Sequence, residues 1–163
     1  MQVRQLTIAD LADYRALHRY WTIESPASTI DTAETDAARL DAEVAATLGR
    51  GEAWGAFDGE RLMGKLAIDA LSYPSLAHTF WVRGVYLHPD ARGAGVSTAL
   101  LRAAIDGART KGASRVALWV SGENARARRF YERLGFRDTG RIPEGIFVNG
   151  KYYDDILMVL ALD

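Results

Sequence analysis

Residues 82–98, VRGVYLHPDARGAGVST, decide the fold of this chain. The segment begins as an apolar strand, turns at Pro89, and continues through a glycine-rich stretch into the first turn of a helix. Amide N–H groups at the start of a helix have no partners within the helix and lie at the positive end of its dipole, so they bind phosphate. Gly93 and Gly95 carry no side chain that would keep a pyrophosphate away, and Arg92 adds a positive charge. The segment therefore predicts a site for a ligand that carries phosphate groups.

Hydrophobic patterns on both sides of this segment predict one α/β domain over residues 1–163. The runs 77–88 and 115–120 are apolar on both faces, which is typical of central strands, and an amphipathic helix at 97–111 joins them. A strand, a helix and a second strand in this order form a right-handed unit with parallel strands. Further strands are expected at 2–8, 53–57, 61–72, 136–142 and 151–161, and further helices at 9–21, 31–49 and 124–134.

The composition excludes several classes of protein. With 20 Lys and Arg against 21 Asp and Glu, the net charge is -1, which disfavours a sequence-independent nucleic-acid binder. The chain has no cysteine and three widely spaced histidines, so we expect no disulfide and no metal site. No apolar run approaches the roughly 20 residues of a membrane span, and the N-terminus lacks the apolar core of a signal peptide. We therefore expect a cytoplasmic protein that binds neither membranes nor nucleic acid.

Other phosphate-binding motifs fit the glycine-rich segment less well. A P-loop needs a lysine directly after its second glycine, and no lysine lies near Gly93 or Gly95. A dinucleotide-binding fingerprint, G-x-G-x-x-G, needs a third glycine where this chain has Thr98. From this segment alone, an ordinary strand-to-helix turn without a ligand stays open.

Two motifs resemble those of the GCN5-related N-acetyltransferases (GNATs). Residues 92–97, RGAGVS, are similar to the R/Q-x-x-G-x-G/A loop of that family, with Ser97 where the family usually has glycine or alanine. Residues 124–136, NARARRFYERLGF, resemble its second signature, N-x-x-A/S-x-x-x-Y-x-x-x-G-F. The order of elements also matches over essentially the whole chain. The resemblance implies a mixed, mostly antiparallel sheet of about seven strands with one parallel, splayed pair, four helices, and acetyl-CoA as co-substrate without a metal.

The resemblance also implies roles for individual residues. The pyrophosphate of coenzyme A would bind the loop and the helix start, at Arg92, Gly93, Ala94, Gly95, Val96, Ser97 and Thr98. The pantetheine arm would bind Asn124 and the free backbone groups of Val85 and Leu87, and the Val85 N–H would face the thioester carbonyl. Tyr131 would be the general acid that protonates the leaving sulfur.

The sequence defines the general base less well. The two positions where members of the family carry a glutamate hold Trp81 and Trp119 here, and neither side chain can accept a proton. We therefore take Glu24, in the expected loop between the first two helices, as the candidate base. Further candidates are His78, Asp154 and Asp155. A water chain, or an amine that arrives neutral, would also serve.

Carboxylates and aromatic rings near the expected acceptor pocket favour a small cationic or zwitterionic amine. We expect Tyr20, Trp21 and Trp54 to line this pocket. The tail 148–154 is similar to a G-x-Y-x-D ending of small-molecule members, including phosphinothricin-type acetyltransferases. The leading hypothesis is an enzyme that transfers an acetyl group from acetyl-CoA to the primary amine of a small molecule by direct attack. Since dimers are common among similar proteins, we also consider a homodimer.

Three alternatives stay open. Trp81 and Trp119 at the base positions would suit a sensor or regulatory module that binds acetyl-CoA without turnover. A protein N-terminal acetyltransferase is a second alternative, although the absence of a glutamate at position 119 disfavours a ribosomal-protein acetyltransferase. A reductase would bind NAD(P)H in preference to coenzyme A.

Overall fold

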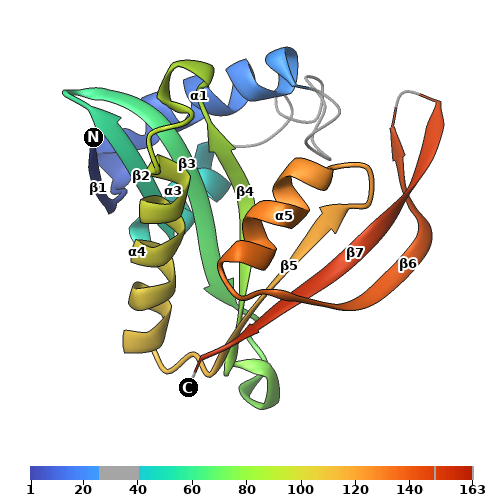
Figure 1. Cartoon of the computed structure of the whole chain (residues 1–163). Helices are drawn as coiled ribbons and strands as arrows, with labels where there is room; N and C mark the ends of the chain where they lie inside the picture. Colours follow the sequence, from blue (N-terminus) through green and yellow to red (C-terminus); the bar gives the residue numbers. More distant parts are fainter. Residues whose placement is uncertain (26–40, 149, 163) are drawn as a thin grey trace.

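The computed structural model describes residues 1–25, 41–148 and 150–162, and its centre is a mixed seven-stranded sheet (Figure 1). The strands lie in the order β1-β2-β3-β4-β5-β7-β6. Neighbouring strands are antiparallel except β4 and β5, which are parallel, as predicted. Their bounds are Gln2–Gln5 (β1), Ala53–Asp58 (β2), Arg61–Ala70 (β3), Thr79–Leu87 (β4), Arg115–Ser121 (β5), Arg137–Val148 (β6) and Lys151–Ala161 (β7).

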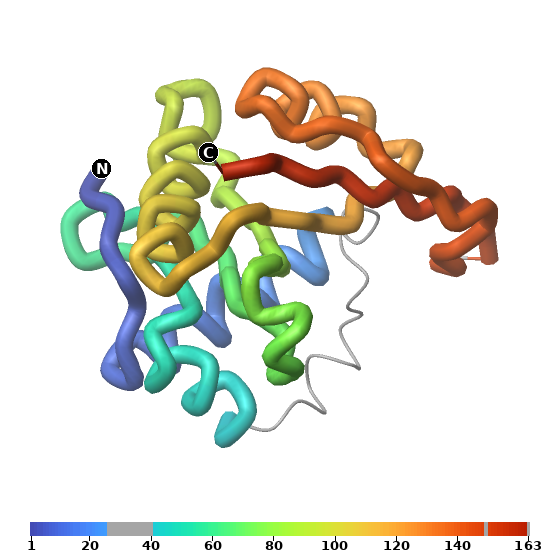
Figure 2. The backbone as a smooth tube through the Cα atoms, turned by 90° about the horizontal axis from the view of Figure 1, so that it is seen from below, coloured from blue at the N-terminus to red at the C-terminus, as the bar shows by residue number. Residues whose placement is uncertain are grey.

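Helices cover both faces of the sheet (Figure 2). One face carries α1 (Leu11–Glu24) and α3 (Asp41–Gly49), and the other carries α4 (Val96–Thr110) and α5 (Ala125–Arg133). Each face has its own buried cluster, the larger one under α4 and α5. The α4 residues Leu100, Leu101 and Ala104 are at most 1% exposed, because the apolar stripe of this helix faces the sheet. The predicted architecture is thus confirmed, with four α-helices in the described part of the chain.

The parallel strands β4 and β5 stay together for only three residue pairs, from Thr79↔Arg115 to Trp81↔Ala117. Beyond these pairs the two strands separate, so their C-terminal halves face a gap rather than each other (Figure 1). Backbone groups on the two sides of this gap therefore have no partner in the neighbouring parallel strand. This is the splayed pair that the resemblance implied.

A β-bulge in β4 lies beside the gap. Two residues of β4, Gly84 and Val85, stand opposite the single residue Leu66 of β3. Gly84 has a φ of 60°, a conformation that glycine adopts without a steric penalty. The bulge bends β4 and turns its backbone at the level where the strand has left β5.

Several elements differ from the prediction in their bounds. The strand predicted at 136–142 continues to Val148, because a bulge around Glu144, with a φ of 54°, lets β6 pair with β7 on both sides of Pro143 and Gly145. The first strand ends earlier, at Gln5. Helix α1 continues to Glu24, so the prediction that this residue lies in a loop is wrong. Of the helix predicted at 31–49, the structure describes Asp41–Gly49, and residues 31–40 lie outside the described residues.

Candidate active site

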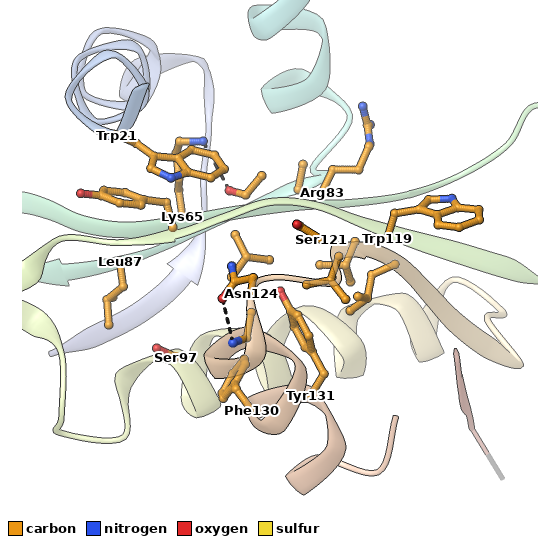
Figure 3. Close-up of a pocket in the computed structure, with 18 of the residues that line it drawn as sticks. Trp21, Lys65, Arg83, Leu87, Ser97, Trp119, Ser121, Asn124, Phe130 and Tyr131 are labelled. Atoms are coloured by element: carbon orange, nitrogen blue, oxygen red, sulfur yellow. Dashed lines mark hydrogen bonds between the residues drawn. The ribbon is translucent and has the colours of Figure 1, made fainter. Parts of the chain in front are cut away.

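A cleft of about 1270 Å³ occupies the gap where β4 and β5 separate. It is lined by residues from both faces of the sheet, so it joins the two faces through the gap. Figure 3 shows Ser97, Asn124, Phe130 and Tyr131 on the side of α4 and α5, and Trp21, Lys65, Arg83 and Trp119 on the opposite side. The first side carries the two sequence motifs, and we call the second side the acceptor face.

The glycine-rich loop forms one end of the cleft. Gly93 and Gly95 have φ values of 91° and 74°, and a Cβ atom on either residue would meet nothing within 4 Å. The first hydrogen bond of α4 runs from the Ala99 N–H to the Gly95 carbonyl, so the N–H groups of residues 96–98 precede it. These amides are the free donors of a helix start. Open space above a cradle of backbone donors fits a pyrophosphate group.

The predicted loop residues reach the cleft in different ways. Val96 is 7% exposed and packs its side chain in the core, so only its backbone is available to a ligand. Ala94 is exposed and is not among the residues that line the cleft. The loop residues that do line it are Arg92, Gly93, Gly95, Val96, Ser97 and Thr98.

Arg92 is held at the edge of the cleft by two contacts. Its Nε donates to the Leu87 carbonyl at 3.1 Å, and its Nη2 lies 3.4 Å from the Glu24 carboxylate. The Leu87 carbonyl, predicted to face pantetheine, thus already accepts one hydrogen bond. The Arg92 charge is partly neutralised, although a phosphate group would offer it a stronger partner.

Glu24, the candidate base, is enclosed by hydrogen-bond donors. The Ser25 hydroxyl donates to it, and so do the Tyr86 hydroxyl at 3.1 Å and Arg92. These donors, with Ser25 contributing most, hold the pKa of the Glu24 carboxyl below its usual value. Glu24 is also not among the residues that line the cleft. The arrangement makes it a weak base and a natural partner for Arg92.

A buried lysine lies behind the bulge of β4. Lys65 is 0% exposed, and its Nζ lies 3.5 Å from the Gly84 carbonyl and 4.4 Å from the centre of the Tyr14 ring. The Gly84 carbonyl and the Val85 N–H belong to one peptide unit, so the ammonium group polarises the amide that was predicted to face the thioester. Sequence reasoning missed Lys65, although a lysine inside the otherwise apolar run 62–68 was an available signal.

Tyr131 lies at the middle of the cleft. It is 7% exposed, and its ring contacts Phe130 and Phe136 with ring centres 5.2 and 5.7 Å away. Figure 3 shows it rising from α5 toward the end of β5, where Ser121 lies. Burial raises the pKa of the Tyr131 hydroxyl, which therefore stays protonated at neutral pH. Since this hydroxyl makes no hydrogen bond to any described residue, it is available to a ligand atom in the cleft.

Asn124 is the N-cap of α5. Its side-chain oxygen accepts a hydrogen bond from the Ala127 N–H at 3.1 Å, as Figure 3 shows. Asn124 also lines the cleft beside Tyr131, so the cap holds the residue where the resemblance expects pantetheine.

The acceptor face is lined by aromatic rings and one ion pair. Trp81 and Trp119 both line the cleft, and Trp119 is 41% exposed. Arg83 on β4 binds Asp69 on β3 at 2.6 Å. The Asp69 carboxylate is thereby committed to a neighbouring cation.

The three aromatic residues expected in the acceptor pocket have different positions. Trp21 lines the cleft, as expected. The expectation is wrong for Trp54, which lies on the other face of the sheet against Gly107 of α4. Tyr20 stacks on His88 with ring centres 4.8 Å apart and is not a lining residue.

The remaining candidates for the general base differ in their position relative to the cleft. His78 is exposed and lies outside the cleft lining. Asp154 binds Arg141 at 3.0 Å and accepts a hydrogen bond from the Glu144 N–H. Asp155 is half-buried and lines the cleft.

Comparison with known sequences decides the family. Residues 14–136 match the sequence model of the acetyltransferase (GNAT) family. The chain belongs to this family. The matched range contains the loop, α4, α5 and both strands of the splayed pair, so the GNAT motifs and the cleft coincide.

The curated relatives include acyltransferases whose names specify what they act on. The chain is 32% identical over 95 residues to the L-amino acid N-acyltransferase MnaT of Escherichia coli, which covers 58% of this chain and 55% of that protein. It is 34% identical over 79 residues to an L-methionine sulfoximine/L-methionine sulfone acetyltransferase of Salmonella typhimurium, covering 48% and 46%. The chain spans between 16% and 55% of the length of the curated relatives it matches.

Solved GNAT structures share the fold over nearly the whole chain. An acetyltransferase of Salmonella typhimurium with its cofactor acetyl-CoA superimposes with a TM-score of 0.85 at 23% identity, covering 100% of this chain and 94% of that one. A phosphinothricin acetyltransferase of Sinorhizobium meliloti in complex with acetyl-CoA gives 0.84 at 22% identity, covering 99% and 88%.

None of the described helices is long and apolar enough to cross a membrane. Within residues 1–25, 41–148 and 150–162, no three His, Cys, Asp or Glu side chains form a group that could hold a metal ion.

Proposed function

We propose that this chain transfers the acetyl group of acetyl-CoA to the primary amine of a small molecule. The cleft between β4 and β5 carries this proposal, because a cradle of backbone donors lies at one end and the buried Tyr131 hydroxyl lies at its middle. Two solved structures of the same fold contain acetyl-CoA, which supports the same co-substrate here.

The chain would hold the co-substrate largely through its backbone. Residues 93–98 would bind the pyrophosphate, and Arg92 would add a charge. The unpaired edge of β4 at Val85 and Leu87 would bind the pantetheine amides in the manner of an added strand. Asn124 would contact the same arm from the start of α5.

Bound acetyl-CoA supplies an acyl group activated as a thioester. The Val85 N–H would donate to the carbonyl oxygen as negative charge develops on it, and the Lys65 ammonium strengthens this donor through the shared peptide unit. Tyr131 would donate a proton to the leaving sulfur. The amine would attack the thioester directly, from the acceptor face.

The acceptor that we propose is a small amine such as an amino acid or an analogue. The names of the curated relatives support this class, since they specify an L-amino acid and methionine sulfoximine or sulfone. The rings of Trp21, Trp81 and Trp119 suit a cation or its apolar substituent. Glu24 as the base, a homodimer and a cytoplasmic location stay predictions.

An acceptor screen tests the proposed function. Purified protein, acetyl-CoA and a panel of amino acids, polyamines and N-terminal peptides are combined, and thiol release and acetylated product are measured. We expect release with a small amine, dependent on both substrates. Tight acetyl-CoA binding without release for any amine would indicate the sensor alternative. Release confined to peptides would indicate a protein N-terminal acetyltransferase, and preferential NAD(P)H binding would indicate a reductase.

A further inference from the structure

The register of the sheet places one carboxylate next to the reacting centre. From the last β4–β5 pair, Trp81↔Ala117, both Val85 and Ser121 lie four residues further along their strands. Because the bulge adds one residue to β4 at Gly84 and Val85, Val85 lies within about one residue of the level of Ser121 on the opposite side of the gap. Ser121 pairs directly with Asp155 of β7. Asp155 is thus one strand away from the place where the thioester would lie.

The Asp155 side chain points to the acceptor face. Residues directly opposite each other in an antiparallel pair lie on the same face, and successive residues alternate. Ile156 and Met158 are 4% and 0% exposed and belong to the core under α4 and α5. Asp155 therefore faces the opposite side, together with Ser121 and Trp119. All three residues line the cleft.

The surroundings of Asp155 leave its charge uncompensated. β5 places the neutral Ser121 beside it, and β6 places Ile142 and Gly145 there. Near this level on β6, the Arg141 side chain and the Glu144 backbone N–H both bind the neighbouring Asp154 rather than Asp155. On β7 the next titratable residue of the same face is Tyr153, a hydroxyl. Asp155 makes no ion pair with any described residue.

The titration of Asp155 also differs from that of Glu24. Burial raises the pKa of the Asp155 carboxyl, and one backbone hydrogen bond from Ile156 opposes this shift. Hydrogen bonds lower the pKa of Glu24, and Asp69 is committed to Arg83. The other carboxylate that lines the cleft, Glu43, is an exposed residue at the start of α3. Two carboxyls with opposite shifts indicate different tasks.

We propose that Asp155 is the general base, which binds the ammonium form of the acceptor and removes its proton directly or through one water. This rests on the proposed acetyl transfer. The acceptor is then an amine that is cationic at neutral pH. Asp155 takes one proton from the ammonium group and passes it to solvent. The neutral amine forms the N–C bond, the C–S bond breaks, and the sulfur takes the Tyr131 proton. The nitrogen loses its second proton as the amide forms, and this proton restores Tyr131.

The test compares Asp155→Asn with wild type on two acceptors. One is the best cationic amine from the screen, and the other is O-methylhydroxylamine, which is already neutral at neutral pH. For the cationic amine we expect kcat/KM to fall about 10²-fold. The loss should shrink at about pH 9 or above, as more of the amine becomes neutral. For O-methylhydroxylamine we expect a change of less than about threefold, since no proton has to be removed first.

Matched controls separate this role from a structural one. Asp138→Asn changes an exposed carboxylate of the same hairpin that binds Arg128 at 3.4 Å, and it should leave both rates unchanged. Calorimetry should give wild-type acetyl-CoA affinity for Asp155→Asn, and Asp155→Glu should restore part of the rate for the cationic amine. If Asp155→Asn retains full kcat/KM with the cationic amine, or loses both acceptors equally, the inference is wrong. If wild type acetylates no amine, the proposed function itself fails.

Discussion

At the phosphate end of the cleft, the binding groups that we propose are backbone amides of residues 93–98, which follow one another in the chain. At the acceptor end, they are side chains from β3, β4, β5 and β7, which only the sheet brings together. The two ends also differ in charge. Arg92 and Glu24 neutralise each other near the loop, whereas Asp155 has no ion-pair partner among the described residues. One end is ready for an anion, and the other is suited to a cation.

The largest effect is expected at the middle of the cleft, between these two ends. Tyr131→Phe should lower kcat about 10²-fold, because the leaving sulfur loses its proton donor. Acetyl-CoA affinity, measured by calorimetry, should stay near that of wild type, since the Phe ring keeps the contacts with Phe130 and Phe136. An unchanged kcat with an unchanged Tm would remove Tyr131 from the mechanism.

The ion-paired carboxylate of Asp10 and the unpaired one of Asp155 should contribute differently to the free energy of unfolding. Arg4 and Thr7 lower the pKa of Asp10 to about 2. Because the folded pKa lies below the unfolded one, this contribution is present above about pH 4 and is lost as the pH falls toward 2. Asp10→Asn should therefore lower the free energy of unfolding at neutral pH by about 2 kcal/mol in urea titrations.

The same urea titrations should give the opposite result for Asp155→Asn. Burial of an unpaired carboxylate costs free energy at neutral pH, so removal of its charge should leave stability unchanged or raise it. A loss for Asp155→Asn as large as that for Asp10→Asn would show that another group compensates the charge of Asp155, and would contradict the uncompensated carboxylate at the acceptor end.

A pair of glycines on α4 tests the backbone cradle. Gly95 and Gly112 lie at opposite ends of the helix, both with positive φ and with open space at the Cβ position. Alanine at either position should cost about 1–2 kcal/mol of stability. Only Gly95→Ala should also raise the KM for acetyl-CoA, by about tenfold or more, because the added methyl group would point into the pyrophosphate site. Equal KM values for the two variants would show that the pyrophosphate does not bind at Gly95.

The smallest effect is expected for Glu24→Gln. If Glu24 only neutralises Arg92, kcat should change by less than about threefold, and acetyl-CoA should bind somewhat more tightly because Arg92 is released for the phosphate. Steady-state kinetics and calorimetry would measure both. A loss of about 10²-fold in kcat would restore Glu24 as the general base and would contradict the role of Asp155.

The difference between the two ends also explains what could be predicted from the sequence. The strand, loop and helix of residues 82–98, the Asn124 cap and the seven strands all follow from local patterns, because the neighbours in the chain are also the neighbours in space. The matching of the loop to a phosphate ligand needed only residue types and their order.

Features that depend on register or on long-range contacts could not be predicted in this way. Glu24 contacts Arg92, which lies 68 residues further along the chain, and the sequence around Glu24 does not indicate this partner. Trp54 was assigned to the wrong face, because the sequence does not say which face of β2 meets α1. Asp155 was only a further candidate after Glu24, and its pairing with Ser121, which lies beside the gap, became visible only in the sheet.

Only three residue pairs join β4 to β5, so the sheet consists of two halves, β1–β4 and β5–β7–β6, that share a short line of backbone pairing. A ligand whose arm lies in the gap would replace the β4–β5 hydrogen bonds that are absent there, and it would hold the two halves of the sheet together. Substrate binding should then slow amide hydrogen exchange along β4 and raise the Tm of the whole domain. After acetyl transfer, the thiol product would still lie between the two halves. Separation of the halves, which releases this product, would then limit the rate of turnover.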